Sequence, residues 1–292
     1  MSKLHAIKEF LSLQEIALFV AVVCIVLALF FPRREIISII LKNPGYVSPE
    51  FIKAVIKVDP AEGLKIALIR NYIKAGRYGK ARKALKNFNL TMNNINFFDY
   101  VELKFKLLRV DYYTAPNASA KDAVKNRIST LLSMLSLSGA SGFNKYIKDN
   151  GRERVRWLFE AYKFESELGN YKLALGLLGE YLTAYPEYKE KYFVKTAVLC
   201  VLAGENMKAY RMLLYYIKTR KNYGDKVKLF EVIAERSILE RNYYLTRLLI
   251  GIYKEDFPRD LKIEKFILTY VLQSGDPYFA RSIAIELSRR KA

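Results

Sequence analysis

The chain has 292 residues, of which 52% are hydrophobic, and it carries 49 Lys and Arg against 29 Asp and Glu, a net charge of +20. This hydrophobic content excludes a disordered chain and can supply a sizeable core. The single histidine, His5, and the two cysteines, Cys24 and Cys200, exclude a disulfide framework and most His/Cys metal sites, which need three or four such ligands.

The first long apolar segment lies near the N-terminus. Residues 16–31 are sixteen consecutive apolar residues, which as a helix span about 24 Å, somewhat less than the roughly 30 Å of a bilayer core. Arg33 and Arg34 follow as a basic stop, and no small-residue cleavage site precedes them. We therefore expect residues 1–32 to form a tail and an uncleaved transmembrane helix, the anchor of a single-pass protein of the bacterial inner membrane.

The orientation of this expected anchor depends on the charges beside it. Basic residues nearly balance across its two ends: Lys3 and Lys8 precede it, and Arg33, Arg34 and Lys42 follow. A basic segment at 65–86 follows closely, and the cytoplasmic leaflet has the more negative surface. These weaker cues favour a cytoplasmic location for the rest of the chain, with the periplasm as the alternative.

Residues 33–292 have a helical pattern of hydrophobicity. Apolar residues recur at intervals of three and four, as in Val155, Leu158, Phe159 and Tyr162, and alternating strand patterns are missing. Ser48-Pro49-Glu50 is typical of a helix N-cap and first turn, which predicts a helix over about 48–57. The fold class expected for this part of the chain is all-α.

Short turns recur through this all-α part, each followed five positions later by a small residue. The five matches are Gly76 with Ala81, Gly169 with Ala174, Gly204 with Ala209, Arg241 with Thr246, and Gly275 with Ala280. The last four turns are spaced by 35, 37 and 34 residues, and a period near 34 predicts a solenoid of helix pairs. Glycine supplies the left-handed backbone that ends the first helix, and the small residue allows the second helix to approach closely.

These turns resemble the tetratricopeptide repeat (TPR) family over roughly 48–292. The closest match is Tyr72-x-x-x-Gly76-x-Tyr78-x-x-Ala81, and Tyr171, Tyr243 and the late prolines Pro186 and Pro258 also fit. Arg241, Thr246, Asn206 and Pro277 depart from the family pattern, and the Trp-Leu-Gly opening of the first helix is missing. The resemblance implies a TPR-like α-solenoid that docks another protein.

One segment, about 94–150, interrupts the period, because Gly76 and Gly169 are 93 residues apart. We expect here a long helix over 94–111, a partner helix over 120–135, a small-residue loop at 137–142 and a short helix over 143–148. The segment is interpreted as an irregular repeat with an extra helix, packed on both sides by its neighbours.

The densest charge lies in the first repeat, where no acid occurs between Glu62 and Asp99. Its basic residues are Lys65, Arg70, Lys74, Arg77, Lys80, Arg82, Lys83 and Lys86. Three interpretations stay open: contact with anionic lipid or an acidic partner, nucleic-acid binding aided by Tyr72 and Tyr78, and a solvated helix face. The 22 tyrosines likewise indicate either an aromatic, basic groove for a peptide or ordinary packing.

The sequence contains no phosphate-binding loop, zinc motif or calcium loop. We therefore expect no enzymatic activity, catalytic residue, metal or cofactor. The hypothesis from sequence is a membrane-anchored interaction scaffold that docks a protein or complex, as an accessory subunit of a bacterial envelope machine for secretion, pilus assembly or exopolysaccharide export. The alternative is a membrane-tethered module that binds a polyanion; anionic lipid is a second candidate partner, and nucleic acid is disfavoured.

Overall fold

The computed structural model describes residues 13–30, 33–42, 47–86, 88, 97–137, 139–257, 260–273 and 275–288. Within these ranges the chain forms sixteen α-helices and two short 3-10 helices, and no strand. The all-α prediction is confirmed, and the packed helices form an α-solenoid. The chain divides into an N-terminal unit, residues 1–90, and a C-terminal unit, residues 91–292.

Helix α2, Leu13–Phe30, corrects the prediction of a membrane anchor. None of the helices in the described ranges is both long enough and apolar enough to cross a membrane. Gln14 and Glu15 occupy the first turn of α2, so its uninterrupted apolar part, 16–30, is about 22 Å long, short of a bilayer core of about 30 Å. This finding contradicts the single-pass anchor over 1–32 and the membrane localisation and orientation derived from it. Residues 1–12 and 31–32 lie outside the described residues. The side chains from Ala17 to Val23 are exposed.

The rest of the N-terminal unit is built around one helix. It comprises α3 (Arg33–Lys42), α4 (Pro49–Val58), α5 (Glu62–Lys74) and α6 (Tyr78–Lys86). The predicted start of α4 is confirmed, because Ser48 Oγ accepts a hydrogen bond from Phe51 N over 3.2 Å and Pro49 takes the first helical position. Helix α5 packs against α3, α4 and α6 and supplies most of the buried side chains, among them Leu64 and Ile69.

The C-terminal unit begins with α7 (Phe97–Thr114), α8 (Ala118–Leu137), α9 (Gly139–Asn150) and the 3-10 helix η2 (Arg152–Val155). The paired long helices agree with the prediction. The small-residue loop expected at 137–142 is wrong for 139–142, since α9 begins at Gly139. Packing explains the longer helix: Phe143 and Tyr146 are buried, with ring centroids 5.6 and 4.7 Å from that of Phe98, and this contact outweighs the weak helix propensity of Gly and Ser.

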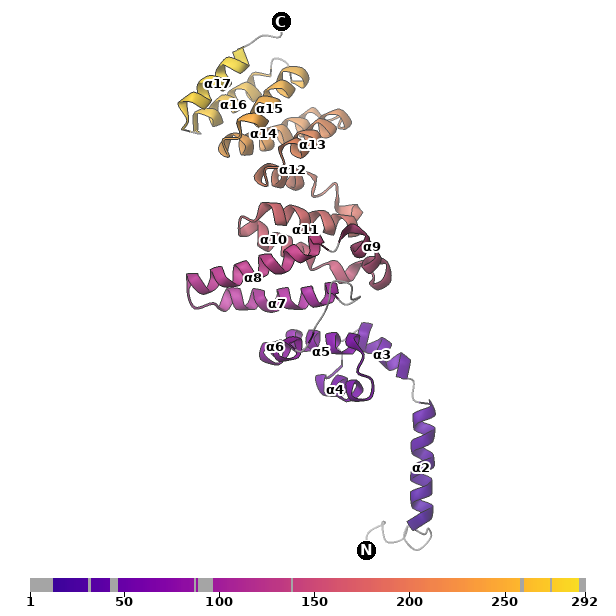
Figure 1. Ribbon diagram of the computed structural model, residues 1–292. Helices are drawn as coiled ribbons and strands as arrows, with labels where there is room; N and C mark the ends of the chain where they lie inside the picture. Colours follow the sequence, from indigo (N-terminus) through magenta and orange to yellow (C-terminus); the bar gives the residue numbers. More distant parts are fainter. Residues whose placement is uncertain are drawn as a thin grey trace. The chain divides into compact units, whose positions relative to one another are not determined.

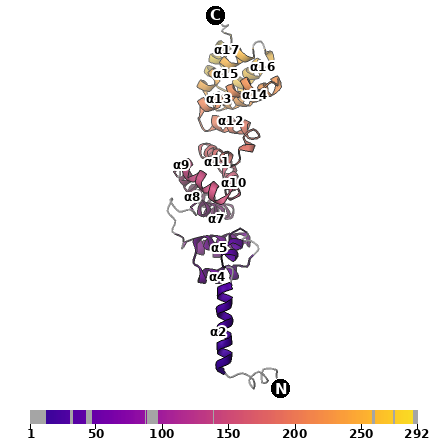
Figure 2. The ribbon, with the colours of Figure 1, turned by 90° about the vertical axis from the view of Figure 1, so that its right-hand side faces the viewer.

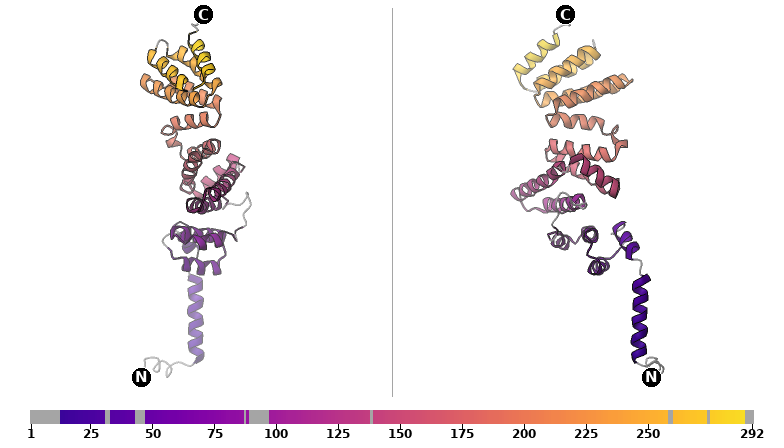
Figure 3. Two further views of the ribbon diagram at one scale, coloured as in Figure 1. Left: turned by 90° about the vertical axis from the view of Figure 1, so that its left-hand side faces the viewer. Right: turned by 45° about the vertical axis from the view of Figure 1, so that its right-hand side comes forward.

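Four regular helix pairs follow. They are α10 (Leu158–Glu167) with α11 (Tyr171–Ala184), α12 (Phe193–Leu202) with α13 (Asn206–Thr219), α14 (Tyr223–Leu239) with α15 (Tyr243–Asp256), and α16 (Leu261–Gln273) with α17 (Pro277–Ser288), with the 3-10 helix η3 (Pro186–Tyr188) after α11. Figure 1 labels these helices in chain order. In Figure 2 the first helices α12, α14 and α16 form one row and the second helices α13, α15 and α17 another, and neighbours within each row are in contact. The right-hand view of Figure 3 shows these pairs layer upon layer.

The turns within the pairs have the predicted backbone. Gly76, Gly169, Gly204 and Gly275 have φ values of 68°, 79°, 76° and 69°, and Arg241 has a φ of 51°. In four of these turns the next residue donates its N–H to the carbonyl five positions earlier, as Glu205 does to Cys200 over 2.8 Å. This is the bonding pattern of a Schellman C-cap. The left-handed turn is therefore confirmed at all five positions, including the one without glycine.

Candidate functional site

The basic residues singled out in the first repeat lie on α5, on α6 and, for Arg77, in the turn between them. Lys65, Lys74, Arg77, Lys80, Arg82, Lys83 and Lys86 are exposed, and Arg70 is half-buried; these eight residues are named the α5–α6 basic surface. Residues 47–86 contain ten Lys and Arg and three Asp and Glu, a net charge of +7. Arg77 pairs with Glu50 at 3.5 Å, and both side chains are exposed. The structure therefore collects this charge on one pair of adjacent helices.

Tyr72 does not share the exposure of its basic neighbours. Its side chain is buried, with 3% of its surface exposed, so its ring cannot offer a face to a stacking base. Lys53, which the sequence did not single out, lies over this ring with Nζ 5.8 Å from the centroid. A hydrogen bond with Tyr72 is the main cause of a raised pKa at Lys53. Lys53 is thus a further cation beside the α5–α6 basic surface.

The small residues expected between paired helices are mostly interior. Ala81, Ala174 and Ala209 are fully buried, Thr246 is buried, and Ala280 is half-buried. Thr246 lies where the other repeats have alanine, and its Oγ1 is 2.8 Å from Ser237 Oγ on the paired helix. A hydroxyl pair therefore replaces the alanine contact in the α14–α15 repeat.

The tyrosines that open the second helices are only partly interior. Tyr78 and Tyr171 are half-buried, and Tyr243 is 41% exposed. The Tyr243 ring centroid lies 4.4 Å from that of Phe279, and its hydroxyl donates to Asp276 over 2.6 Å. Tyr243 therefore contacts the following repeat through Phe279 and Asp276.

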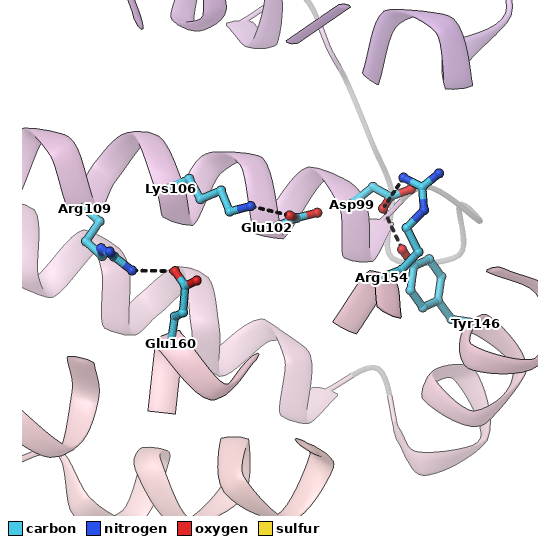
Figure 4. Close-up of polar contacts among 7 residues, drawn as sticks. All are labelled: Asp99, Glu102, Lys106, Arg109, Tyr146, Arg154 and Glu160. Carbon is cyan, nitrogen blue, oxygen red and sulfur yellow. Dashed lines mark hydrogen bonds and ion pairs between the residues drawn. The ribbon is translucent and has the colours of Figure 1, made fainter. Parts of the chain in front are cut away.

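Charged side chains of α7 form hydrogen bonds and ion pairs within the C-terminal unit. Tyr146 of α9 donates its hydroxyl to Asp99 Oδ1 over 2.6 Å, and Arg154 Nη1 lies 3.9 Å from the same oxygen. Figure 4 shows these groups beside the Glu102–Lys106 pair of α7 and the Arg109–Glu160 pair. The latter joins α7 to α10 over 2.7 Å. These contacts hold the irregular repeat together and present no open catalytic arrangement.

A second aromatic and basic region, missed from the sequence, lies around the end of α11. Tyr181, Tyr185, Tyr188 and Tyr192 have neighbouring ring centroids 4.8 to 6.3 Å apart. Phe159 of α10 joins them, with its centroid 5.0 Å from that of Tyr181. The signal for this region in the sequence was the i, i+4, i+7, i+11 spacing of the four tyrosines.

The buried carboxylate of Glu165 in the C-terminal unit is joined to structural partners. Glu165 is fully buried and accepts hydrogen bonds from Asn170 Nδ2 over 2.6 Å and Ser129 Oγ over 3.1 Å. Burial raises the pKa of Glu165, while these two hydrogen bonds and Lys125 oppose the rise. Glu165 thereby joins α8 to the turn between α10 and α11. Among the described residues, no group of three or more His, Cys, Asp and Glu side chains could hold a metal ion.

Comparisons with known proteins find no match to this chain among protein-family models, curated proteins or solved structures.

Proposed function

We propose that this chain is a docking scaffold without catalytic activity, whose helix pairs are TPR-like repeats and whose α5–α6 basic surface binds an acidic segment of a partner protein. The observation that carries the proposal is the charge of residues 47–86, +7 in total. Seven of the eight singled-out residues are exposed on two adjacent helices and the turn that joins them. An acidic partner complements such a surface and is steered towards it by its field.

The TPR-like part of the proposal rests on the repeat geometry. Left-handed turns at Gly169, Gly204, Arg241 and Gly275 recur with spacings of 35, 37 and 34 residues. The buried Ala174 and Ala209 follow their turns by five positions. A solenoid of such pairs has an extended surface suited to binding a polypeptide.

Acidic protein is favoured over nucleic acid because Tyr72, one of the two rings among these charges, is buried. Stacking of bases on aromatic rings supplies much of the affinity for single strands, and a buried ring cannot supply it. The ammonium and guanidinium groups of the α5–α6 basic surface can still bind carboxylates.

The test compares two variants of the full chain with equal charge changes. One carries Lys80→Glu, Lys83→Glu and Lys86→Glu; the control carries Lys172→Glu, Lys218→Glu and Lys262→Glu, all at exposed positions of the C-terminal unit. Fluorescence anisotropy measures binding to a labelled twelve-residue polyglutamate, an oligo-dT of twelve nucleotides and phosphatidylglycerol vesicles.

We expect the parent and the control to bind polyglutamate, with an affinity that falls as salt screens the charges. The first variant should bind about tenfold more weakly, since each exposed pair is worth up to about 1 kcal/mol. Equal weakening in both variants would contradict a localised site. If the parent binds oligo-dT or the vesicles more tightly than polyglutamate, the proposed ligand is wrong, and the ligand is nucleic acid or lipid instead of an acidic protein.

A further inference from the structure

We infer that a second docking site lies in the C-terminal unit and takes an acidic segment that also carries apolar side chains. The site, named the aromatic–lysine surface, consists of Phe159, Lys163, Tyr188, Lys191, Tyr192 and Lys195. It rests on the proposed docking function and adds the chemistry of the segment that is bound.

The surface is assembled from α10, the start of α12 and the segment between α11 and α12 that contains η3. Lys163 Nζ lies 4.6 Å from the centroid of the Phe159 ring, both on α10. Lys195 of α12 lies 5.6 Å from the centroid of Tyr162 on α10, which brings the first helices of consecutive repeats together. Lys191 lies 5.7 Å from the centroid of Tyr192 and 6.0 Å from that of Tyr188. Three ammonium groups are thus held over aromatic rings and remain exposed.

These lysines lack carboxylate partners for a specific reason. Three nearby acids are directed to arginines instead: Glu160 pairs with Arg109 at 2.7 Å, Glu187 with Arg152 at 2.8 Å, and Glu190 with Arg220. No described residue forms an ion pair with any of the three lysines of the aromatic–lysine surface. Their charge is therefore available to an external carboxylate.

Apolar surface lies directly beside this charge. Tyr188 is 38% exposed and Val194 is 40% exposed, and Val194 is the neighbour of Lys195 on α12. A segment with both carboxylates and apolar side chains matches this combination, because it adds burial of apolar area to the charge pairing.

Ring faces are largely used by contacts within the chain. Lysines lie over Phe159, Tyr162, Tyr188 and Tyr192, and Tyr181 stacks on Tyr188 at an interplanar angle of 10°. A nucleobase needs a free ring face, whereas a carboxylate needs the exposed ammonium group. The arrangement therefore favours an acidic peptide over a single-stranded nucleic acid.

The experiment removes the α5–α6 basic surface first, so that the two sites are tested separately. Full-length chain with Lys80→Glu, Lys83→Glu and Lys86→Glu serves as the background. Anisotropy then measures binding of the labelled peptides (Glu-Glu-Leu)4 and (Gln-Gln-Leu)4, of polyglutamate and of oligo-dT. A second set of changes, Lys163→Glu, Lys191→Glu and Lys195→Glu, is compared with the control set Lys172→Glu, Lys218→Glu and Lys262→Glu.

We expect (Glu-Glu-Leu)4 to bind the background about tenfold more tightly than (Gln-Gln-Leu)4. Adding Lys163→Glu, Lys191→Glu and Lys195→Glu should weaken the binding of (Glu-Glu-Leu)4 about tenfold, whereas adding the control set should not. Val194→Asp should weaken (Glu-Glu-Leu)4 more than polyglutamate. Hydrogen exchange should show that the peptide protects amides of 186–198. The inference is overturned by absence of binding in the background, by equal loss in the control set, or by preference for oligo-dT. A different result separates the two proposals. If Lys80→Glu, Lys83→Glu and Lys86→Glu do not weaken polyglutamate binding but the second set weakens (Glu-Glu-Leu)4 binding, the α5–α6 basic surface is not a docking site and the aromatic–lysine surface is.

Discussion

The hydroxyl of Tyr243, the first residue of α15, donates a hydrogen bond over 2.6 Å to the carboxylate of Asp276, which precedes α17. Asp276 Oδ1 also accepts the N–H groups of Tyr278 and Phe279, each over 3.0 Å, so it caps α17. Tyr223 and Asp260 repeat the arrangement between α14 and α16, again over 2.6 Å. In each case one aspartate caps the start of a helix and joins it to the equivalent helix of the preceding repeat.

The Tyr223–Asp260 bond predicts a dependence of stability on pH. The hydrogen bond from Tyr223 lowers the pKa of Asp260 from 3.8, and Asp260 in turn raises the pKa of Tyr223 to about 12. The aspartate contribution is present above pH 3.8 and is lost as the pH falls through the lower pKa of the folded state. The tyrosine contribution is present below pH 10 and is lost as the pH rises through about 12.

Tyr223→Phe should therefore lower the melting temperature most between about pH 4 and pH 10, and the difference from the parent should shrink at pH 3. Thermal unfolding followed by circular dichroism from pH 3 to pH 7 measures this. Tyr278→Phe is the control, because Tyr278 is 85% exposed. A difference that does not change with pH would contradict the predicted coupling.

Ala209→Leu tests the packing between paired helices. Ala209 is fully buried on α13, and the added carbons must displace packed neighbours at a cost of about 1–3 kcal/mol. The melting temperature should fall by about 2–4 °C per kcal/mol. Lys172→Leu, at an exposed position of α11, should leave it nearly unchanged. Equal melting temperatures for Ala209→Leu and the parent would refute the register of the repeat.

The left-handed turns predict a difference between glycine and alanine at the same position. Arg241 has a φ of 51°, a conformation that costs a residue with a Cβ about 1–2 kcal/mol. Arg241→Gly should therefore be about 1 kcal/mol more stable than Arg241→Ala, and both variants lose the same arginine contacts. Urea unfolding of the two variants gives the comparison, and an advantage for alanine would be the contrary result.

Gly204→Ala should lower the free energy of unfolding, because it places a Cβ where the parent has glycine. Gly204 has a φ of 76°, and no atom lies within 4 Å of the position that a Cβ would take. The expected loss of about 1 kcal/mol therefore comes from the backbone conformation alone. Gly176→Ala, also in open space but without a positive φ, is the matched control and should be neutral or stabilising. Similar losses at both positions would argue against the conformational cause.

Glu165→Gln should make stability less dependent on pH. Burial raises the pKa of Glu165 above 4.5, so its contribution is fully present below pH 4.5 and is lost as the pH rises through the folded-state pKa. The amide stays neutral, and the variant should gain stability relative to the parent as the pH rises from 4.5 to 8. Denaturant unfolding across this range measures the effect. Glu167→Gln, at an exposed position, should show no such trend; a parallel trend in both would contradict the assignment.

Local chemistry in the sequence determined most of the helical framework. The turns at Gly76, Gly169, Gly204 and Gly275 could be predicted because few residues other than glycine adopt a positive φ at low cost. The period of 34 to 37 residues between the last four turns then indicated a solenoid. The eight basic residues of the first repeat could also be identified from the sequence. They lie close together along the chain, so their clustering is a local property.

Contacts between repeats were decided only by the tertiary structure. Tyr243 and Asp276 are 33 residues apart, and Lys195 and Tyr162 are also 33 apart, so no local pattern indicated that they meet. The burial of Tyr72 among exposed lysines likewise depends on how α4 and α5 pack. The length of α2 overturned the expected membrane anchor, and the packing of Phe143 and Tyr146 extended α9 through a glycine-rich start. For Tyr243, Lys195, Tyr72 and α9 the deciding free energy comes from burial and from side-chain contacts between elements far apart in the chain.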